Sequence, residues 1–515
     1  MFVVTEVIDT DSDEELDLDD EAKKDRTKTQ VLVNTANIID QADQNMLPVM
    51  YSSVQVTTGL SIQQLGNVTL ARALLQSISS PLWGWLSDRY SRKMILGIGC
   101  IIWGVFTSLL GVLFTNNLNP TANYAGMIVI RAFIGLGLAV IFPTAQSLIA
   151  DFFPKTKRGK AFGVLGLTGI VGAIIGMLFA GFVADINIGS IEGWRFSFIV
   201  IGSFSVVLGV LVMALGKDPI RGALERGTQV QTQEPKEKYK TTWKDYKEIL
   251  TNKTFLLIIA QGSAGSIPWN SILWMPYWLE HLGFDSGLTA IAFAVVAIGA
   301  AGGNLFGGYI GDWIEKRNPD KGRIMIAQIS VFAGIPMMFI LFLLMPRQST
   351  TGVLIGFIIF GIVTGFLISW CGPAANNPIL SELFKPEIRG TAFALDRLFE
   401  GSVAASGTAV VAAIATGLGF TDPGAGQPIS SLTALQISTN IDAMAWGIII
   451  ATAIPWTICL LFYSFLYITY PKDRDRTRKI MLEQMNNPDS IKSEIKLEDE
   501  VEAVSDDAEA NNEGG

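Results

Sequence analysis

Long apolar segments recur along the whole chain, and they constrain its fold more than any other feature. Each spans about twenty residues or more, enough to cross about 30 Å of hydrocarbon as a helix. Lipid offers backbone groups no hydrogen-bond partners, and a barrel would show alternating polar residues, so each segment is predicted to be a transmembrane helix. We find twelve, near residues 31–54, 65–86, 94–115, 122–150, 160–184, 194–216, 254–279, 287–311, 323–345, 350–380, 391–419 and 441–470.

The composition agrees with a protein that lies mainly in a membrane. Of its 515 residues, 50% are hydrophobic and only 17% are charged, which is unusual for a soluble protein. The cysteines Cys100, Cys371 and Cys459 are isolated within apolar segments, a spacing that excludes a disulfide framework and argues against a metal site. The predicted fold class is an all-α membrane protein with twelve transmembrane helices, and we expect no cofactor and no metal.

Lysine and arginine are distributed unevenly among the connections. Those after the even-numbered segments hold Arg89, Arg92 and Lys93; Lys155, Lys157, Arg158 and Lys160; a lysine-rich run at 217–253; Lys316, Arg317, Lys321 and Arg323; and Lys385 and Arg389. Connections after the odd-numbered segments are almost free of both, with Arg347 as the exception. By the positive-inside rule, we expect both termini and the even connections in the cytoplasm. An endomembrane and the plasma membrane are both compatible with this pattern.

Acidic residues concentrate in the two tails. Residues 1–30 hold 11 acids and 4 bases, and residues 471–515 hold 13 acids and 7 bases. Both stretches have too little apolar surface to fold, so we expect solvated, disordered tails. The expected organisation is therefore a tail at 1–30, a six-helix bundle at 31–216, a cytoplasmic linker at 217–253, a second six-helix bundle at 254–470 and a tail at 471–515.

Two sequence patterns occur twice in the chain. GWLSDRYSRK at 84–93 is repeated by GGYIGDWIEKR at 307–317, with an offset of 224 between the matching glycines. ADFFPKTKRGKAFG at 150–163 is repeated by SELFKPEIRGTAFA at 381–394, with an offset of 231. Similar offsets in the same order indicate an internal duplication, so we predict two pseudo-symmetric halves of six helices each.

The first of these patterns, G-x-L-x-D-R-x-x-R-K between segments 2 and 3, resembles the signature of the major facilitator superfamily. RAFIGLGLA at 131–139 is similar to the family's arginine motif in the fourth segment, and NNPILSELFKPEIRG followed by ALDRLFEG resembles the Spinster-like branch, particularly its plant and protist members. The resemblance covers about residues 31–470. It implies a secondary transporter that works by alternating access, with segments 1, 4, 7 and 10 lining a central cavity.

The repeated charged motifs imply, through this resemblance, a cytoplasmic gate that breaks and remakes contacts as the halves rock. Its candidate residues are Gly84, Asp88, Arg89, Arg92, Lys93, Arg158, Gly308, Asp312, Arg317 and Arg389. Asp88 precedes the N-terminus of the next helix, whose dipole favours an acid there. The alternative is that these bases only fix topology, although topology alone requires neither the aspartate nor the glycine spacing.

Charged side chains inside the apolar segments are costly, at about 2.5 to 3.5 kcal/mol each, and are functional candidates for that reason. Asp40 and Asp43 lie three residues apart in segment 1, hence on one helical face. Two close carboxylates in a dry cavity cannot easily both ionise, which suits a proton carrier. Arg131 is the expected counter-charge, and Arg72 belongs to the same proton-coupling set. A structural ion pair, or a position at the membrane edge, is the alternative.

Segments 7 and 10 are interrupted by prolines and glycines, which free backbone groups that must face protein or a cavity. The candidate cavity residues are Asn270, Trp274, Trp370, Asn376, Asn377, Asp396 and Glu400. Tryptophans often only pack, and Asp396 and Glu400 could instead form an intramembrane pair that locks helices. In segment 5, Gly166, Gly169, Gly172 and Gly176 predict a face for close helix packing.

We therefore expect a secondary active transporter of a small organic or amphipathic lipid-like solute, coupled to protons. Its expected partners are this substrate, protons and the lipid bilayer, with no nucleic acid, and it is expected to be a monomer. A membrane enzyme is disfavoured because no nucleophile elbow, metal-ligand cluster or phosphate loop is found, and the single histidine, His281, lies at the outer end of segment 7. The alternative function is a non-transporting membrane sensor with the same fold.

Overall fold

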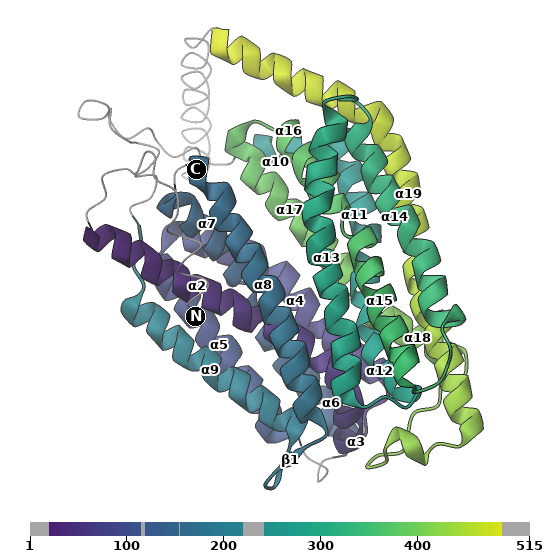
Figure 1. Cartoon of the computed structure of the whole chain (residues 1–515). Coiled ribbons are helices and arrows are strands. Elements are labelled where there is room, and N and C mark those ends of the chain that lie inside the picture. The colour runs from purple at the N-terminus through teal and green to yellow at the C-terminus, as the bar shows by residue number, and fades with distance from the viewer. Residues whose placement is uncertain (1–19, 115–118, 154, 220–241, 487–515) are drawn as a thin grey trace, which may run out of the picture.

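The structure is a computed structural model that describes residues 20–114, 119–153, 155–219 and 242–486. Each of the twelve apolar segments is helical, and together they form the two halves of six spans that the sequence predicts. Figure 1 shows the halves side by side, the first coloured purple to blue and the second teal through green to yellow. Most of the predicted linker and large parts of both predicted tails lie outside the described residues.

The N-terminal half contains spans 1 to 6. Span 1 is α2 (Asp20–Met46), η1 (Leu47–Met50) and α3 (Tyr51–Thr58), and span 4 is α6 (Pro120–Leu138) and α7 (Ile141–Phe152). The others are single helices: α4 (Ile62–Arg89), α5 (Arg92–Leu113), α8 (Lys155–Ala184) and α9 (Gly193–Leu215). A short antiparallel hairpin of β1 (Asn187–Ile188) and β2 (Ile191–Glu192) connects α8 to α9.

The C-terminal half contains spans 7 to 12, preceded by the short helix α10 (Trp243–Thr251). Span 7 is α11 (Lys253–Ser271), η2 (Ile272–Trp274) and α12 (Met275–His281), and span 8 is α13 (Ser286–Glu315). Span 9 is α14 (Gly322–Phe339) and η3 (Ile340–Leu344), and span 10 is α15 (Thr351–Ile368), η4 (Gly372–Asn376) and α16 (Asn377–Leu383). Span 11 is α17 (Pro386–Ala404) and α18 (Gly407–Gly417), and after η5 (Ile429–Ser431) span 12 is α19 (Ala434–Asn486).

Nine spans in the described part of the chain are long and apolar enough to cross a membrane by length and composition alone. The three that fall short are spans 1, 2 and 7. Span 1 begins with the polar helix α2, and span 7 changes to a 3-10 turn at Ile272–Trp274. Polar or interrupted spans are tolerated where their backbone and polar side chains face protein rather than lipid.

Prolines and glycines break spans 7 and 10 as the sequence predicts. In span 7 the α-helix ends after Pro268 and restarts at Met275, just before Pro276. In span 10 the helix stops at Ile368 and resumes through the π-helical segment Gly372–Asn376. These interruptions follow from the missing N–H of proline and its clash with the preceding turn.

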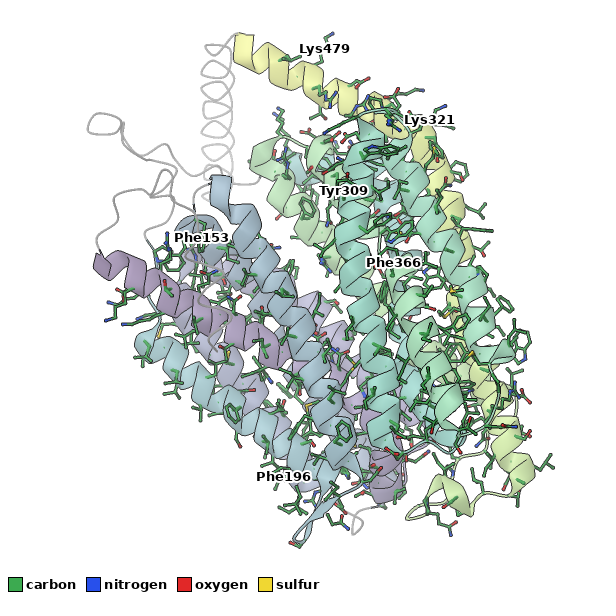
Figure 2. All side chains as sticks on the ribbon, in the orientation of Figure 1. Phe153, Phe196, Tyr309, Lys321, Phe366 and Lys479 are labelled. Carbon is green, nitrogen blue, oxygen red and sulfur yellow. The ribbon has the colours of Figure 1, made fainter. Side chains whose placement is uncertain are left out.

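The alternation of spans defines two ends of the bundle. We call the end where α2 begins and α19 finishes the terminal end, and the opposite end the far end. Figure 2 shows Lys321 and Lys479 at the terminal end, uppermost in the view, and Phe196 at the far end. The basic connections after the even spans lie together at the terminal end, as an even number of crossings requires.

Both chain ends are more helical than expected. We predicted disorder for residues 1–30 and 471–515, but α2 already begins at Asp20 and α19 continues to Asn486. The expected linker likewise contains α10 at its C-terminal side. Charge composition alone does not reveal hydrogen bonds to distant parts of the chain.

Such tethers hold the last part of α19. The Arg474 guanidinium donates to Asp320 Oδ1 at 2.7 Å and to the Pro319 carbonyl at 2.9 Å. The Thr477 hydroxyl donates to the Leu383 carbonyl at 2.8 Å. Both contacts join α19 to the terminal end of the C-terminal half, so the helix continues beyond the apolar segment instead of fraying.

Candidate functional site

A buried ion pair lies in the N-terminal half. Arg131 on α6 places Nη1 3.9 Å from Asp43 Oδ2 on α2, and both side chains are completely buried. Asp43 Oδ1 also accepts from the Thr107 hydroxyl at 3.5 Å. Within the described residues, the Arg131 guanidinium nitrogens have no hydrogen-bond partner. The sequence prediction that Arg131 is the counter-charge of Asp43 therefore agrees with the geometry.

Asp40 lies one turn earlier on α2 and has different partners. Its Oδ1 accepts from Gln44 Nε2 at 2.9 Å and its Oδ2 from Gln41 Nε2 at 3.0 Å. The side chain is 4% exposed. Asp40 is thus held by neutral amides of its own helix, whereas Asp43 faces a cation.

Arg72 on α4 completes the group. It donates to Gln76 Oε1 at 3.0 Å and lies near enough to Asp43 and Asp40 to attract both. Gly135 sets this proximity, because a Cβ there would lie 2.1 Å from the Arg72 carbonyl oxygen. Glycine lets α6 touch α4, so Arg131, one turn before Gly135, lies beside Arg72. The two aspartates and two arginines carry no net charge when all are ionised.

The C-terminal half holds a second acidic group, on α17. Glu400 accepts a hydrogen bond from the Ser266 hydroxyl on α11. A Cβ on Gly262 would lie 3.2 Å from Glu400 Cδ, so the glycine makes room for this carboxylate. Asp396, one turn before Glu400, is 9% exposed, and its Oδ1 has no hydrogen-bond partner in the described part of the chain. Arg397 stacks over Phe142 of the other half, 5.0 Å from the ring centroid.

The remaining cavity candidates are not brought together at one place. Asn376 accepts from the Tyr463 hydroxyl at 2.6 Å, and Asn377 is exposed. Asn270 is half-buried and packs against Gly407. Trp370 belongs to an aromatic cluster inside the C-terminal half, with Phe306 and Phe366 at 5.1 and 5.8 Å.

The terminal end carries the repeated charged motifs, and their geometry is also repeated. Arg89 stacks over Trp85 at 4.2 Å, and Arg317 stacks over Trp313 at 3.8 Å, with the same offset of four residues. Cβ atoms on Gly84 and Gly308 would lie 3.8 Å from Pro143 and 3.7 Å from Pro373, in spans 4 and 10 respectively. The duplication inferred from sequence is therefore a duplication of contacts.

In the C-terminal motif the central contact is made by Arg323. Its Nη2 donates to Asp312 Oδ1 at 2.9 Å and to Glu315, and its Nη1 donates to the Ala374 carbonyl at 3.0 Å. Arg323 thereby links α13, α14 and the interrupted span 10. The sequence expectation for this motif centred on Arg317 and omitted Arg323, and the offset of 224 relates Arg92 to Lys316 rather than to Arg323.

The other motif residues have diverse placements. The side chains of Asp88 and Arg158 lie outside the described residues. Arg92 is buried at the start of α5, and the Lys93 backbone N–H donates to Asp218 Oδ1 at 3.1 Å. Arg389 donates to the Phe384 carbonyl at 3.4 Å.

At the far end the two halves are in direct contact. Tyr51 stacks against Trp274 with ring centroids 4.5 Å apart, and the Trp274 indole donates to the Thr408 carbonyl at 2.9 Å. The Thr408 hydroxyl donates back across the interface to the Gly66 carbonyl at 3.0 Å. Trp274 is thus part of the far-end closure. The sequence prediction gave it a place in the cavity wall but could not anticipate its partners.

Two bundles of six spans, with charged side chains buried inside each and a closed interface at one end, define the class of a polytopic membrane transporter. In the described residues, no cluster of three or more histidine, cysteine or acidic side chains could hold a metal ion. A model of the Major Facilitator Superfamily matches residues 33–408. The chain belongs to this superfamily and is therefore an integral, multi-pass membrane protein of a transporter family.

Individual relatives agree with this assignment. The chain is 24% identical to protein spinster homolog 3 of Mus musculus over 379 residues, covering 70% of this chain and 69% of that protein. It is 23% identical to a probable L-galactonate transporter of Escherichia coli (strain K12), covering 64% and 70%. A crystal structure of a bacterial homolog to the human lysosomal transporter Spinster, inward-facing and unoccupied, shares the fold with a TM-score of 0.73 at 17% identity, covering 87% and 98%. The Spinster-like assignment made from sequence is confirmed.

Proposed function

We propose that this protein is a proton-coupled secondary transporter that moves a small organic or amphipathic lipid-like solute by alternating access. Membership of the superfamily supports secondary transport, and one solved structure of the same fold is a D-xylose-proton symporter. The observation that carries the proposal of proton coupling is the fully buried pair of Asp43 and Arg131.

Asp43 and Arg131 are fully buried, but not all of their hydrogen-bonding groups have a partner among the described residues. A buried ion pair is stable only when its geometry is good and its remaining donors are bonded. Here the closest approach is 3.9 Å, and Arg131 makes no hydrogen bond within the described part of the chain. Protonation of Asp43 therefore costs little direct bonding and changes the net charge of the cluster by one. Because charges interact strongly in a dry interior, this change of charge shifts the relative stability of the different packings of the two halves.

The substrate class follows from the second acidic group and its apolar surroundings. Asp396 and Glu400 supply polar groups in the C-terminal half, and Phe142 and the interrupted spans supply apolar ones. A solute with a polar head and an apolar body fits both. We propose that the protein acts as a monomer, since each half provides its own charged group within one chain.

The distribution of charge and the contacts between the halves support one orientation in the membrane and one conformational state. We propose that the terminal end, with the basic connections, faces the cytoplasm. The contacts of Trp274 and Thr408 close the far end, which corresponds to a state open toward the cytoplasm. The links of Arg323 to Asp312 and Ala374, which are formed in this state, would then rearrange as the terminal end closes.

Transport by purified protein in liposomes tests the proposal. Proteoliposomes with an imposed pH gradient would be offered lysolipids, sugars, amino acids and organic anions, with internal pH followed by a trapped dye. We expect accumulation of one class together with proton movement. Asp43→Asn should abolish gradient-driven accumulation while preserving exchange of labelled for unlabelled solute. Asp442→Asn is the matched control, because Asp442 forms only a partly exposed ion pair with Arg347.

Two results would contradict the proposal. Unchanged gradient-driven accumulation by Asp43→Asn would exclude this carboxylate from coupling. Saturable ligand binding without flux of any solute would favour the sensor function instead.

A further inference from the structure

The connection between α18 and α19 crosses from the C-terminal half onto the N-terminal half. Asp422 Oδ1 accepts from the Ile62 backbone N–H at 2.8 Å and from Gln55 Nε2 at 2.8 Å. Four residues later, the Gly426 N–H donates to the Val56 carbonyl at 3.0 Å. One side chain and one backbone group of this loop thus bind the turn between α3 and α4.

Gln55 is held by both halves. Its Nε2 also donates to the Leu60 carbonyl at 2.9 Å, and its Oε1 accepts from the Tyr277 hydroxyl at 2.5 Å. Gln55 is 2% exposed and Tyr277 is completely buried. Because every polar atom of the amide makes a hydrogen bond, the orientation of the Gln55 side chain is fixed. Its Nε2 is therefore positioned to donate to Asp422.

The turn is shaped to receive the loop. Gly59 ends α3 with a φ of +69°, a left-handed conformation that favours glycine. A Cβ there would also lie 2.8 Å from Ala425 Cβ of the loop. Backbone conformation and space therefore both require glycine at the point where the two halves meet.

Asp422 has an unusual electrostatic setting for a carboxylate between two domains. It lies at the N-terminus of α4, whose dipole favours a negative charge. The titratable groups of α12 on this side are Tyr277 and His281. The His281 ring lies 3.4 Å from the Asn440 amide, which in turn accepts from the Thr421 N–H beside Asp422. In the described part of α3 and α4, Asp422 meets only Gln55 and backbone. No salt bridge to Asp422 is found among the described residues. Burial raises the pKa of Asp422 above its usual value, although the two hydrogen bonds act in the opposite direction.

We propose that Asp422 is the positioning residue of the far-end closure, and that protonation of its carboxyl from the compartment facing the far end holds the two halves together there. This inference rests on the proposed alternating access. Both cross-half hydrogen bonds end on Oδ1, so a proton on Oδ2 leaves them in place. The docked loop can therefore be neutral and still fully bonded.

The direction of the pH effect on closure follows from the linkage between proton binding and conformation. When the halves part, Asp422 meets water and its pKa returns to the ordinary value of about 3.9. The closed state has the raised pKa, so it binds the proton more tightly than the open state. Acidification of the far-end compartment, at pH values above the ordinary pKa, should stabilise closure. A rise in pH should release it.

Distance measurements between spin labels test this inference without requiring a substrate. Labels would be attached at Ser190→Cys and Gln348→Cys, exposed far-end positions in the two halves, in full-length protein without its native cysteines and in lipid nanodiscs. Between pH 7.5 and pH 5, we expect the ratio of short to long distances to rise about fivefold or more.

Two substitutions of Asp422 separate the effect of protonating its carboxyl from the effect of losing its hydrogen bonds. Asp422→Asn keeps an acceptor oxygen for Ile62 and Gln55 but cannot titrate, so its distances should stay short and independent of pH. Asp422→Ala loses both bonds and should give long distances at every pH. A pH response in Asp422→Asn equal to that of the wild type would overturn this proposal alone. A single unchanging distance in all variants would overturn alternating access as well.

Discussion

At the residue scale, the informative side chains are polar groups that the fold buries. The sequence could pair Arg131 with the two aspartates of segment 1, because opposite charges within apolar segments have few other partners. It could not separate the roles of Asp40 and Asp43, because the choice between Gln44 and Arg131 as partner depends on how α2 is rotated.

The ion pair makes a testable contribution to stability. Arg131→Met should leave the two buried aspartates with Arg72 as their one described counter-charge and lower the free energy of unfolding by about 3 to 5 kcal/mol. The double variant with Asp43→Asn removes both charges and should recover most of this loss. Thermal unfolding of the protein in one detergent gives the comparison. Equal melting temperatures of the single and double variants would show that the two side chains do not interact.

Partners far apart in sequence were beyond prediction. Gln55, Tyr277 and Asp422 are ordinary polar residues of loops and helix ends when read along the chain. They become one network only when segments separated by 367 and 222 residues meet. Arg323 belongs with these residues, because its hydrogen bond to Ala374 joins positions 51 apart in the sequence.

At the element scale, the twelve helices were predictable because apolar length is a strong signal for a transmembrane helix. The exceptions have physical reasons. The polar helix α2 directs polar side chains to other spans, with Asp43 beside Arg131 and Asn37 donating to the Leu165 carbonyl. The continuation of α19 depends on contacts such as Arg474 with Asp320. Both are tertiary effects that composition does not encode.

The predicted glycine face of span 5 is confirmed in part. Cβ atoms on Gly172 and Gly176 would lie 2.3 Å from the Ile38 carbonyl oxygen and 2.4 Å from Ala42 Cα, so α8 touches α2 there. Gly166 has nothing within 4 Å and does not belong to the contact. The spacing of the glycines predicted the face, but not where along it the helices cross.

The different surroundings of Gly176 and Gly166 predict different effects on stability when each is replaced by alanine. Gly176→Ala forces two backbones apart and should destabilise the protein by about 1 to 3 kcal/mol. Gly166→Ala is the matched control on the same helix, and it should be neutral or stabilising because alanine favours helix. Thermal unfolding of both variants decides the matter. A loss for Gly166→Ala as large as that for Gly176→Ala would contradict the assigned crossing point.

At the scale of the whole molecule, the two halves resemble each other both in sequence and in the contacts that their repeated motifs make. Matching stacks of Arg89 on Trp85 and Arg317 on Trp313 place the two motifs at one end of the bundle. The sequence predicted this arrangement from the repeat. It could not predict that the far end is closed, because closure depends on contacts between distant residues of the two halves, such as Thr408 with Gly66.

The proposed topology can be checked in intact cells. Single cysteines replacing Tyr90 and Lys316 at the terminal end, and Ser190 and Gln348 at the far end, would be introduced in a background without native cysteines. An impermeant maleimide should label only the far-end pair before the membrane is opened, if the protein resides in the plasma membrane. In sealed vesicles from an internal membrane, where the cytoplasmic face is outside, the pattern should reverse. Labelling of Tyr90→Cys and Lys316→Cys from opposite sides would contradict the topology.

The hydrogen bonds that Arg474 and Thr477 make near the end of α19 have a practical consequence for the design of shortened or extended genes. A stop codon placed after Tyr470 would preserve all the apolar segments, yet it would remove Arg474 and Thr477 and so the attachments to Asp320 and Leu383. Affinity tags and fluorescent fusions belong beyond Asn486, the last described residue of the anchored helix.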